Sequence, residues 1–307
     1  MFDIHPIVWL QSWSSPFMTG FMNGVSLLGY TRACIALAVL LAFFFRLRPA
    51  LALFVLLGVN GALTDVAKTT AALPRPDWVS GDVQRLALFV RNMPAPAGDA
   101  APPPEDSYGF PSGHVSATTA FAIGLAMLFR FRRTGWTLVV AWIALMALSR
   151  MYLGRHFLGD VIGGVVVGLA SAGISFALLR VGHLAKGLQT HRPWPVHRVM
   201  VIAAALAVSA LVAGLPDAGD AGRLVGLSAG LLVLVNHDLF TPAGSVRGRV
   251  LLLMSAALGF GVVWWLTTLV PREEVLSRAS ALRFVVSALP TAAMLIVPAM
   301  LPRRLAS

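Results

Sequence analysis

Charged residues are scarce in this chain, and their scarcity restricts its class. Asp, Glu, Lys and Arg make up 12% of the 307 residues, whereas soluble domains contain about 25%. Hydrophobic residues make up 57% of the chain, and its mean hydropathy is +0.78. These values exclude a soluble globule with one large core and predict an all-α integral membrane protein.

Cysteine and lysine are nearly absent. Cys34 is the one cysteine, which excludes an intrachain disulfide and a cysteine-based metal cluster. Because it lies within the first long apolar segment, we expect it to be a small buried residue. Lys68 and Lys186 are the two lysines among 24 Lys and Arg residues. This bias is typical of a GC-rich bacterial genome, and it makes Lys68 conspicuous.

The net charge of +11 lacks the clustering that nucleic-acid binding requires. No basic run is interleaved with aromatic residues, so we expect no nucleic-acid partner. No repeat at a fixed period and no low-complexity tract occurs. No Lys or Arg precedes Arg32, which predicts that the first apolar run stays as an anchor and is not a cleaved signal peptide.

Nine apolar segments are long enough, or nearly so, to cross about 30 Å of hydrocarbon. We predict transmembrane helices at 25–45, 50–70, 113–130, 136–153, 157–180, 199–215, 222–238, 250–270 and 284–302. They define four parts of the chain: a periplasmic interfacial segment 1–24, a core 25–180 with an outer loop 74–112, a cytoplasmic linker 181–198, and a C-terminal extension 199–307 of about four helices.

Aromatic residues recur at intervals of four in residues 1–24, at Trp9, Trp13, Phe17 and Phe21. This spacing predicts a short helix on the membrane surface, interrupted by Pro16. A loose tail with its aromatics among the lipid headgroups is the alternative.

The loops between the predicted helices differ in charge on the two sides of the membrane. One side carries 13 basic residues and one acid, Asp238, and the other carries 11 basic and 12 acidic residues. The positive-inside rule assigns the first side to the cytoplasm. We therefore expect a bacterial inner-membrane protein with a periplasmic N-terminus and a cytoplasmic C-terminus.

Three polar stretches lie at the outer ends of these helices. They read K-x6-R-P, P-S-G-H and S-R-x5-H-x3-D, and their chemically distinctive residues are Lys68, Arg75, Ser112, Gly113, His114, Arg150, His156 and Asp160. If a helix begins near His156, Asp160 lies on the same face and can fix the imidazole tautomer. The other ring nitrogen is then a candidate nucleophile.

The remaining residues of these stretches suit a phosphate group. Lys68, Arg75 and Arg150 are cations for its nonbridging oxygens. Ser112 and Gly113 lie where a helix starts, so that backbone N–H groups can also bind an anion. His114 is a candidate general acid. We expect the three stretches to converge, with His114 and His156 within about 10 Å of each other, which is the reach of one phosphoryl group.

Together these stretches resemble the signature of the type 2 phosphatidic acid phosphatase (PAP2) family, which also includes glucose-6-phosphatases and vanadium haloperoxidases. The resemblance covers roughly residues 50–180, and every position of the signature is occupied by the expected residue. It implies a PAP2-type helical core, a phosphohistidine intermediate on His156, orientation of that residue by Asp160, and proton transfer by His114. It also implies that neither a metal nor a cofactor is used.

The expected function is hydrolysis of a lipid phosphate or pyrophosphate at the periplasmic face, with membrane lipids as partners. Nine helices with this topology also resemble glucose-6-phosphatase, so a soluble sugar phosphate is an alternative substrate. Haloperoxidases are soluble, which argues against that activity here. A non-catalytic scaffold or transporter is disfavoured because no signature residue is lost. The last four helices are candidates for a homodimer contact, a lateral lipid gate or a partner site.

The outer loop 74–112 is the longest connection, and five prolines between 94 and 104 oppose regular structure there. Residues 85–91 are predicted as a short helix on the membrane surface. A lid over the site and a solvated tether are both compatible with such a loop. Arg155 is expected to pair with a lipid or a loop acid, and Asp77 to tune the site or cap a turn.

Overall fold

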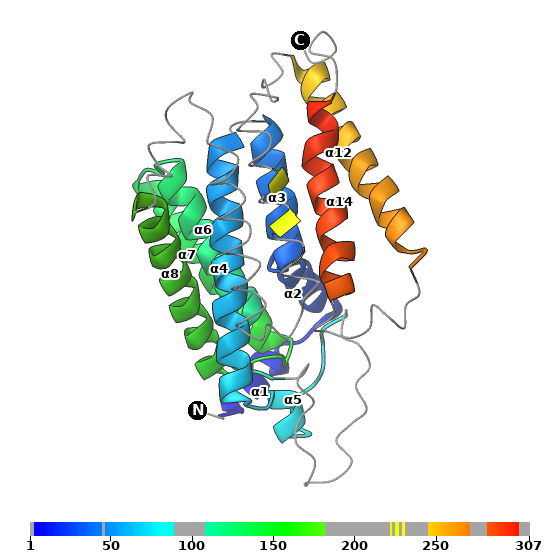
Figure 1. The fold of residues 1–307 in the computed structure, drawn as a ribbon. Helices are drawn as coiled ribbons and strands as arrows, with labels where there is room; N and C mark the ends of the chain where they lie inside the picture. The colour runs from blue at the N-terminus through cyan, green and yellow to red at the C-terminus, as the bar shows by residue number, and fades with distance from the viewer. Residues whose placement is uncertain are drawn as a thin grey trace. The chain divides into compact units, whose positions relative to one another are not determined.

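The structure is a computed structural model that describes residues 3–44, 47–88, 108–181, 222, 225–226, 229–230, 245–270 and 281–300. Within these ranges every regular element is a helix, as the all-α prediction requires (Figure 1). The chain forms two compact units. The first contains Met1–Cys34 and Val59–Gly173, and the second contains Ile35–Gly58 and Ile174–Ser307.

Six of the segments predicted to cross the membrane are helices close to their expected bounds. They are α4 (Leu47–Ala71), α6 (Gly113–Leu128), α7 (Arg133–Tyr152), α8 (Leu158–Val181), α12 (Val246–Thr267) and α14 (Ala281–Ala299). Of the described helices, four are long and apolar enough to cross a membrane, or five if α2 and α3 count as one bent span. The predicted helix 199–215 and most of 222–238 lie outside the described residues.

The first predicted membrane helix, 25–45, is wrong in its bounds. The chain instead forms α2 (Pro16–Leu28) and α3 (Thr31–Phe44), which are separated by Gly29 and Tyr30. At the end of α2 the Gly29 N–H donates to the Ser26 carbonyl and the Tyr30 N–H donates to the Leu27 carbonyl, at 3.0 and 3.3 Å. The apolar run crosses this break without a change in composition, so hydropathy alone does not reveal it.

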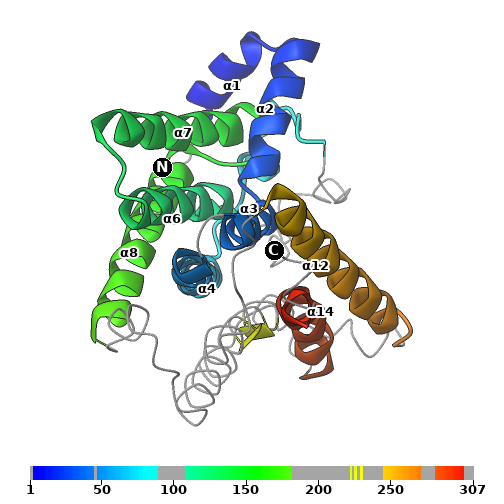
Figure 2. The same cartoon turned by 90° about the horizontal axis from the view of Figure 1, so that it is seen from above.

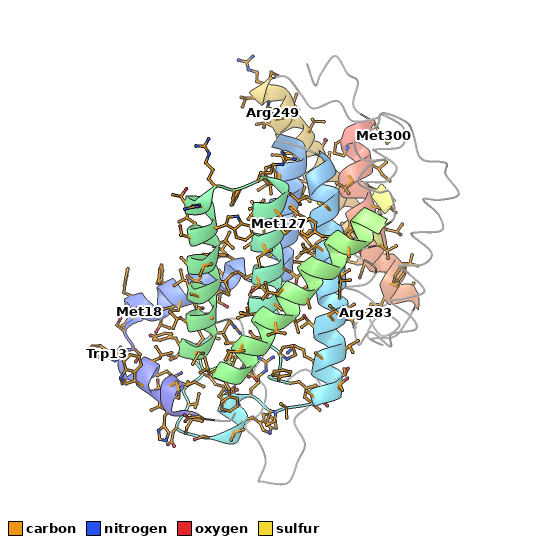
Figure 3. All side chains as sticks on the ribbon, turned by 90° about the vertical axis from the view of Figure 1, so that its left-hand side faces the viewer. Trp13, Met18, Met127, Arg249, Arg283 and Met300 are labelled. Carbon is orange, nitrogen blue, oxygen red and sulfur yellow. The ribbon has the colours of Figure 1, made fainter. Side chains whose placement is uncertain are left out.

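Residues 1–24 form two helices rather than one interrupted helix. Helix α1 spans His5–Ser12, and α2 begins at Pro16 after the Ser15 side chain accepts a hydrogen bond from the Met18 backbone. Pro16 therefore starts a helix, because a first-turn residue needs no N–H donor. The four aromatic residues are 48–81% exposed, and Figure 3 shows Trp13 at the outer edge of this helix pair.

Helix α6 is the central helix of the first unit. It packs against α7, and Thr64 of α4 shares a 2.9 Å hydrogen bond with Ser116 of α6. Gly164 and Gly168 of α8 lie against its first two turns. Figures 1 and 2 show α6 running beside α7 and α8. Ten of its 16 residues are buried, and such all-round burial leaves no polar face on the helix.

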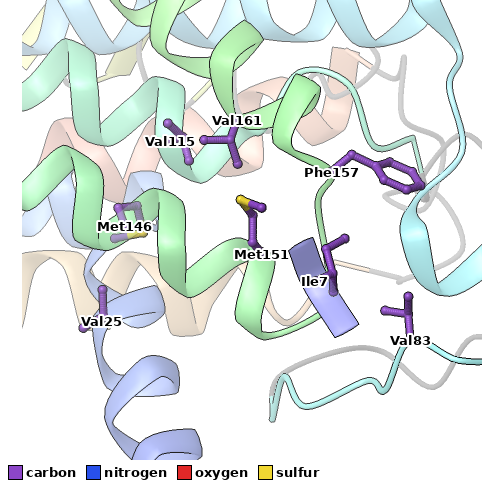
Figure 4. Packing of buried hydrophobic residues seen from close by; sticks show 8 residues of the cluster. All are labelled: Ile7, Val25, Val83, Val115, Met146, Met151, Phe157 and Val161. Carbon is purple, nitrogen blue, oxygen red and sulfur yellow. The ribbon is translucent and has the colours of Figure 1, made fainter. Parts of the chain in front are cut away.

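The ends of α7 and α8 enclose a cluster of buried hydrophobic residues. The cluster consists of Ile7, Val25, Val83, Val115, Met146, Met151, Phe157 and Val161. Figure 4 shows Ile7, Val83 and Phe157 on one side of Met151, with Val115 and Val161 on the other. Helices α1 and α2 pack against α7 from outside. The cluster fixes the turn between α7 and α8, which carries His156.

The predicted surface helix at 85–91 is wrong over its described part, because residues 84–87 are not helical and 88 is a turn. In this segment, backbone N–H and carbonyl groups form hydrogen bonds with the side-chain amides of Gln11 and Asn23. Gln11 donates to the Gln84 carbonyl and accepts from its N–H at 2.8 and 3.0 Å. Asn23 forms the same kind of pair with the Leu86 carbonyl and the Leu88 N–H. These bonds replace those that a helix would need. Residues 89–91 lie outside the described part.

In the second unit, α12 and α14 pack against each other. Gly259 of α12 lies close to Val297 and Ala293 of α14. This close approach is typical of apolar helices that associate through small residues.

Candidate active site

His156 lies in the turn between α7 and α8. Helix α7 ends at Tyr152, and α8 begins at Leu158. All nine residues from 149 to 157 are buried. Gly154 makes the turn with φ of +71° and lies against the Gln84 carbonyl, where a side chain would collide with backbone. A glycine is therefore required there, because other residues rarely adopt this conformation.

Asp160, in the first turn of α8, faces His156 as the spacing predicted. Its Oδ2 lies 3.5 Å from His156 Nδ1, and both side chains are 2% exposed. The same oxygen accepts a 2.9 Å hydrogen bond from the Phe157 N–H. Catalytic hydrogen bonds are often long in unliganded sites and shorten when substrate binds. With Nδ1 turned to the carboxylate, Nε2 is the nitrogen left for chemistry.

Burial lowers the pKa of His156 well below its usual 6.5, and the charges of Arg75, Arg150 and Lys68 lower the pKa further. His114 contributes in the same direction. His156 is therefore neutral at pH 7, with a lone pair available to attack. Lys68, Arg75 and His114 lie more than 40 positions before His156 in the sequence, and the fold brings them close enough to act on it electrostatically.

Ser112 and Gly113 form the N-terminus of α6, as predicted. Ser112 is the N-cap residue, but its hydroxyl forms no capping bond. Its backbone N–H donates to the Asp160 carbonyl at 2.9 Å. This bond ties the start of α6 to the first turn of α8. The first N–H groups of a helix lack intrahelical acceptors, so they and the helix dipole favour an anion at this end.

Buried polar side chains hold this end of α6 in place. Ser116 donates to the Gly113 carbonyl at 3.1 Å and shares its 2.9 Å bond with Thr64 of α4. An added Cβ at Gly113 would lie 3.7 Å from Thr64 and 3.9 Å from the Lys68 side chain. Thr64 and Ser116 therefore set the position of the α6 N-terminus relative to Lys68.

Glycines of α8 allow it to approach α6 at the same level. A Cβ on Gly164 would lie 2.7 Å from the Ser112 carbonyl oxygen. A Cβ on Gly168 would lie 2.6 Å from Thr119 Cβ and 2.7 Å from the Ser116 carbonyl oxygen. These α6 atoms cannot move away without moving the helix, so the position of the α6 N-terminus depends on the two glycines.

Gly168→Ala is expected to lower thermal stability, whereas Gly173→Ala on the same helix is not. Overpacking at residue 168 costs about 1–3 kcal/mol. Gly173 has nothing within 4 Å of an added Cβ, and alanine gains up to about 1 kcal/mol over glycine in a helix. Thermal unfolding of the two variants in detergent measures the difference. Equal midpoints would contradict the close approach of α6 and α8.

The predicted cations come from three elements. Lys68, in the last turn of α4, donates to the Tyr108 carbonyl at 2.9 Å. Arg75 is the N-cap residue of the short helix α5 (Pro76–Val79). Arg150, in the last turn of α7, is 4% exposed and donates to the Ser26 hydroxyl. The carboxylates of Asp65, Asp77 and Asp160 also act on Lys68 or Arg75. Buried cations gathered in this way suit an anionic ligand.

The two ends of the outer loop meet beside these residues. The Gly109 N–H donates to the Leu73 carbonyl at 2.7 Å. A Cβ at Gly109 would lie 2.8 Å from the Pro74 carbonyl oxygen and 3.1 Å from Asp160 Oδ2. The base of the loop therefore borders the carboxylate, while residues 89–107 lie outside the described part.

His114 lies in the first turn of α6, and its imidazole packs against the ring of Tyr30. The ring centroids are 4.4 Å apart and the planes meet at 68°, an edge-to-face arrangement. Its Nε2 is buried and has no hydrogen-bond partner within the described protein.

Polar atoms without partners concentrate at this site. Seven buried side-chain nitrogen and oxygen atoms of the described residues have no hydrogen-bond partner, and four belong to predicted site residues: Ser112 Oγ, His114 Nε2, Arg150 Nε and His156 Nδ1. Buried polar groups are normally paired. The first three can donate to an anion, which is the kind of ligand that the sequence predicted for these residues.

Arg155 pairs with a loop acid, one of the two partners expected for it. Its guanidinium lies 3.0 Å from Asp77 Oδ2, which also lies 2.8 Å from Arg85. Asp77 follows the Arg-Pro motif and thereby links the α7–α8 turn to residues 75–85. Asp77 bridges Arg85 and Arg155, a role that the sequence did not predict for it.

Sequence reasoning missed Ser26 and Tyr30, which contact Arg150 and His114. They lie in α2 and at the α2–α3 break, far from the three polar stretches, and no spacing rule connects them. It also missed Thr64 and Ser116. Both are hydroxyl residues close to the motifs in the sequence, and this proximity could have indicated them. Thr64 is four residues before Lys68, and Ser116 is two residues after His114.

Part of the chain is similar to known proteins. Residues 49–182 match the sequence model of the PAP2 superfamily, the family that the motifs resembled. A solved structure of LpxE from Aquifex aeolicus is similar, with a TM-score of 0.48 and 20% sequence identity. That match covers 58% of this chain and 96% of the other. No curated protein matches the chain significantly.

Proposed function

We propose that the chain is a membrane phosphatase for a lipid phosphate monoester or pyrophosphate, on the premise that residues 49–182 match the sequence model of the PAP2 superfamily. This match supports phosphate hydrolysis in general. The observation that carries the proposal is the arrangement around His156. A neutral buried imidazole faces a carboxylate, and the unpartnered donors of Ser112, His114 and Arg150 lie nearby.

In the proposed first step, His156 Nε2 attacks phosphorus and a P–N bond forms while the bond to the leaving oxygen breaks. The electron pair of that bond departs with the oxygen, which takes a proton from His114. In the second step, water attacks phosphorus and the P–N bond breaks, returning its electron pair to Nε2. His114 accepts the proton that water loses, which restores the starting state.

The other predicted site residues stabilise the charges that develop during these two steps. Asp160 stabilises the positive charge that forms on His156 as the P–N bond is made. Lys68, Arg75, Arg150 and the N-terminus of α6 bind the nonbridging oxygens and stabilise the transition state. In this proposal the cations of the protein take the part that a metal ion has in other phosphatases. We therefore expect phosphate release to be unaffected by a chelator.

A lipid substrate is favoured by the hydropathy of the chain. The proposed site lies at the ends of apolar helices, and the charge asymmetry of the loops assigns this side to the periplasm of an inner membrane. A lipid can enter sideways with its tail in hydrocarbon and its phosphate among the headgroups. A sugar phosphate must arrive from water and gains nothing from that location.

Catalytic efficiency is expected to rise steeply with the length of the substrate tail. Each buried CH₂ adds about 0.8 kcal/mol of binding, or roughly fourfold in efficiency, until the groove is full. Phosphate release in detergent with a chelator measures this on matched phosphates of increasing chain length. The panel also includes phosphatidic acid, phosphatidylglycerophosphate, undecaprenyl pyrophosphate, lipid A phosphates and glucose 6-phosphate.

The panel separates the two candidate substrate classes. A flat response to tail length, with saturable hydrolysis of glucose 6-phosphate, contradicts the lipid substrate and leaves the phosphohistidine mechanism intact. The His156→Ala variant, purified in parallel, is the blank. Release from no phosphate ester at all contradicts the phosphatase proposal itself.

A further inference from the structure

Helix α2 and the break after it contact residues of the candidate site, although both precede the matched segment 49–182. The Ser26 hydroxyl accepts from Arg150. The Ser149 hydroxyl donates to the Met22 carbonyl at 2.8 Å. Tyr30, directly after the break, contacts His114. Two predicted site residues therefore take a neighbour from outside the segment that carries the signature.

The contact between Tyr30 and His114 depends on Gly29. A Cβ at Gly29 would lie 2.7 Å from the end of the Met146 side chain and 3.2 Å from His114 Cβ. Met146 itself is fully buried. The absence of a side chain at residue 29 thus lets the backbone reach the His114 side chain, and the next residue places its ring on the imidazole.

No hydrogen bond orients His114 through Nε2, since that atom has no partner within the described protein. The ring contact at 4.4 Å and 68° is a specific geometry, because the positive edge of one ring meets the negative face of the other. It restricts rotation of the imidazole, whose angle decides where Nε2 points. A general acid must point its proton at the leaving oxygen.

We propose that Tyr30 is a positioning residue for His114, holding the imidazole in the orientation that delivers a proton to the leaving group. The proposal rests on the proposed phosphatase function. Tyr30 acts through its ring and not its hydroxyl. Its removal should therefore impair proton delivery while leaving phosphate binding and the attack of His156 in place.

The test compares two leaving groups. An alkyl phosphate needs a proton on its departing oxygen, whereas a 4-nitrophenyl phosphate leaves readily without one. Tyr30→Ala and Tyr30→Leu should lower kcat on the alkyl ester about 10²-fold and on the aryl ester less than about fivefold. Tyr30→Phe keeps the ring and should retain near-normal kcat on both. Leu28→Ala, at an exposed residue of α2, is the matched control.

A double variant tests whether Tyr30 acts through His114. In a His114→Ala background, Tyr30→Ala should cause no further loss on the alkyl ester, because the group that it positions is gone. Independent effects that multiply overturn the proposal, as does an equal loss on both esters in Tyr30→Ala and Tyr30→Leu. A loss in Tyr30→Phe as large as in Tyr30→Ala also overturns it, since that would assign the effect to the hydroxyl. A wild-type protein inactive on every ester contradicts the proposed function instead.

Discussion

His156→Ala is expected to abolish phosphate release and the covalent intermediate together. Burial holds the pKa of His156 below its usual value, so the wild-type imidazole is neutral and nucleophilic at pH 7. Alanine offers no atom to form the P–N bond. Removal of a covalent nucleophile in a well-studied hydrolase costs on the order of 10⁶ in turnover, and we expect a comparable loss here. Rapid quenching with ³²P-labelled substrate measures the phosphoenzyme directly.

His114→Ala is the matched control, because it removes a second imidazole, half-buried, beside the same cations. Its loss should depend on the leaving group, being large for an alkyl ester and small for an aryl ester. A phosphoenzyme should still form from the aryl ester. If the two histidine variants lose activity equally on every substrate, the assignment of nucleophile and general acid is wrong.

The sequence predicted the parts of the fold that local patterns determine. Long apolar runs gave six helices near their observed bounds, and the Pro-Ser-Gly sequence at 111–113 marked the start of α6. The four-residue spacing of His156 and Asp160 predicted their contact. Each of these inferences uses residues that lie within one continuous segment of the chain, where local backbone geometry decides which of them share a face.

The parts that failed depend on contacts between distant residues. Residues 84–88 are not helical because Gln11 and Asn23, more than 60 positions earlier, bind their backbone. The break at Gly29 and Tyr30 is fixed by packing against Met146 and His114. Ser26 reaches Arg150 across 124 positions. Hydropathy and spacing carry no information about such pairs. The contact of His156 with Asp160 could therefore be predicted, but not the residues that support the candidate site.

Asp160→Asn is expected to reduce turnover by about 10³- to 10⁴-fold while the protein stays folded, by analogy with the buried carboxylate of catalytic triads. Asparagine has nearly the same size, and its carbonyl oxygen can still accept the bond that Phe157 donates to Oδ2 at 2.9 Å. The Asp160 backbone carbonyl, which accepts from Ser112, is unchanged. The substitution therefore removes charge and little else.

The missing charge acts on the chemical step. In the wild type, the carboxylate lies 3.5 Å from His156 Nδ1, where it stabilises the cation that forms as Nε2 bonds to phosphorus. A neutral amide cannot do so, and the surrounding cations of Lys68, Arg75 and Arg150 oppose that cation. Quenched single-turnover experiments should show slow phosphoenzyme formation with nearly unchanged KM. The control is Asp82→Asn, at an exposed carboxylate, which should keep wild-type turnover. If Asp160→Asn also keeps near-normal turnover with an unchanged melting temperature, Asp160 has no part in the mechanism.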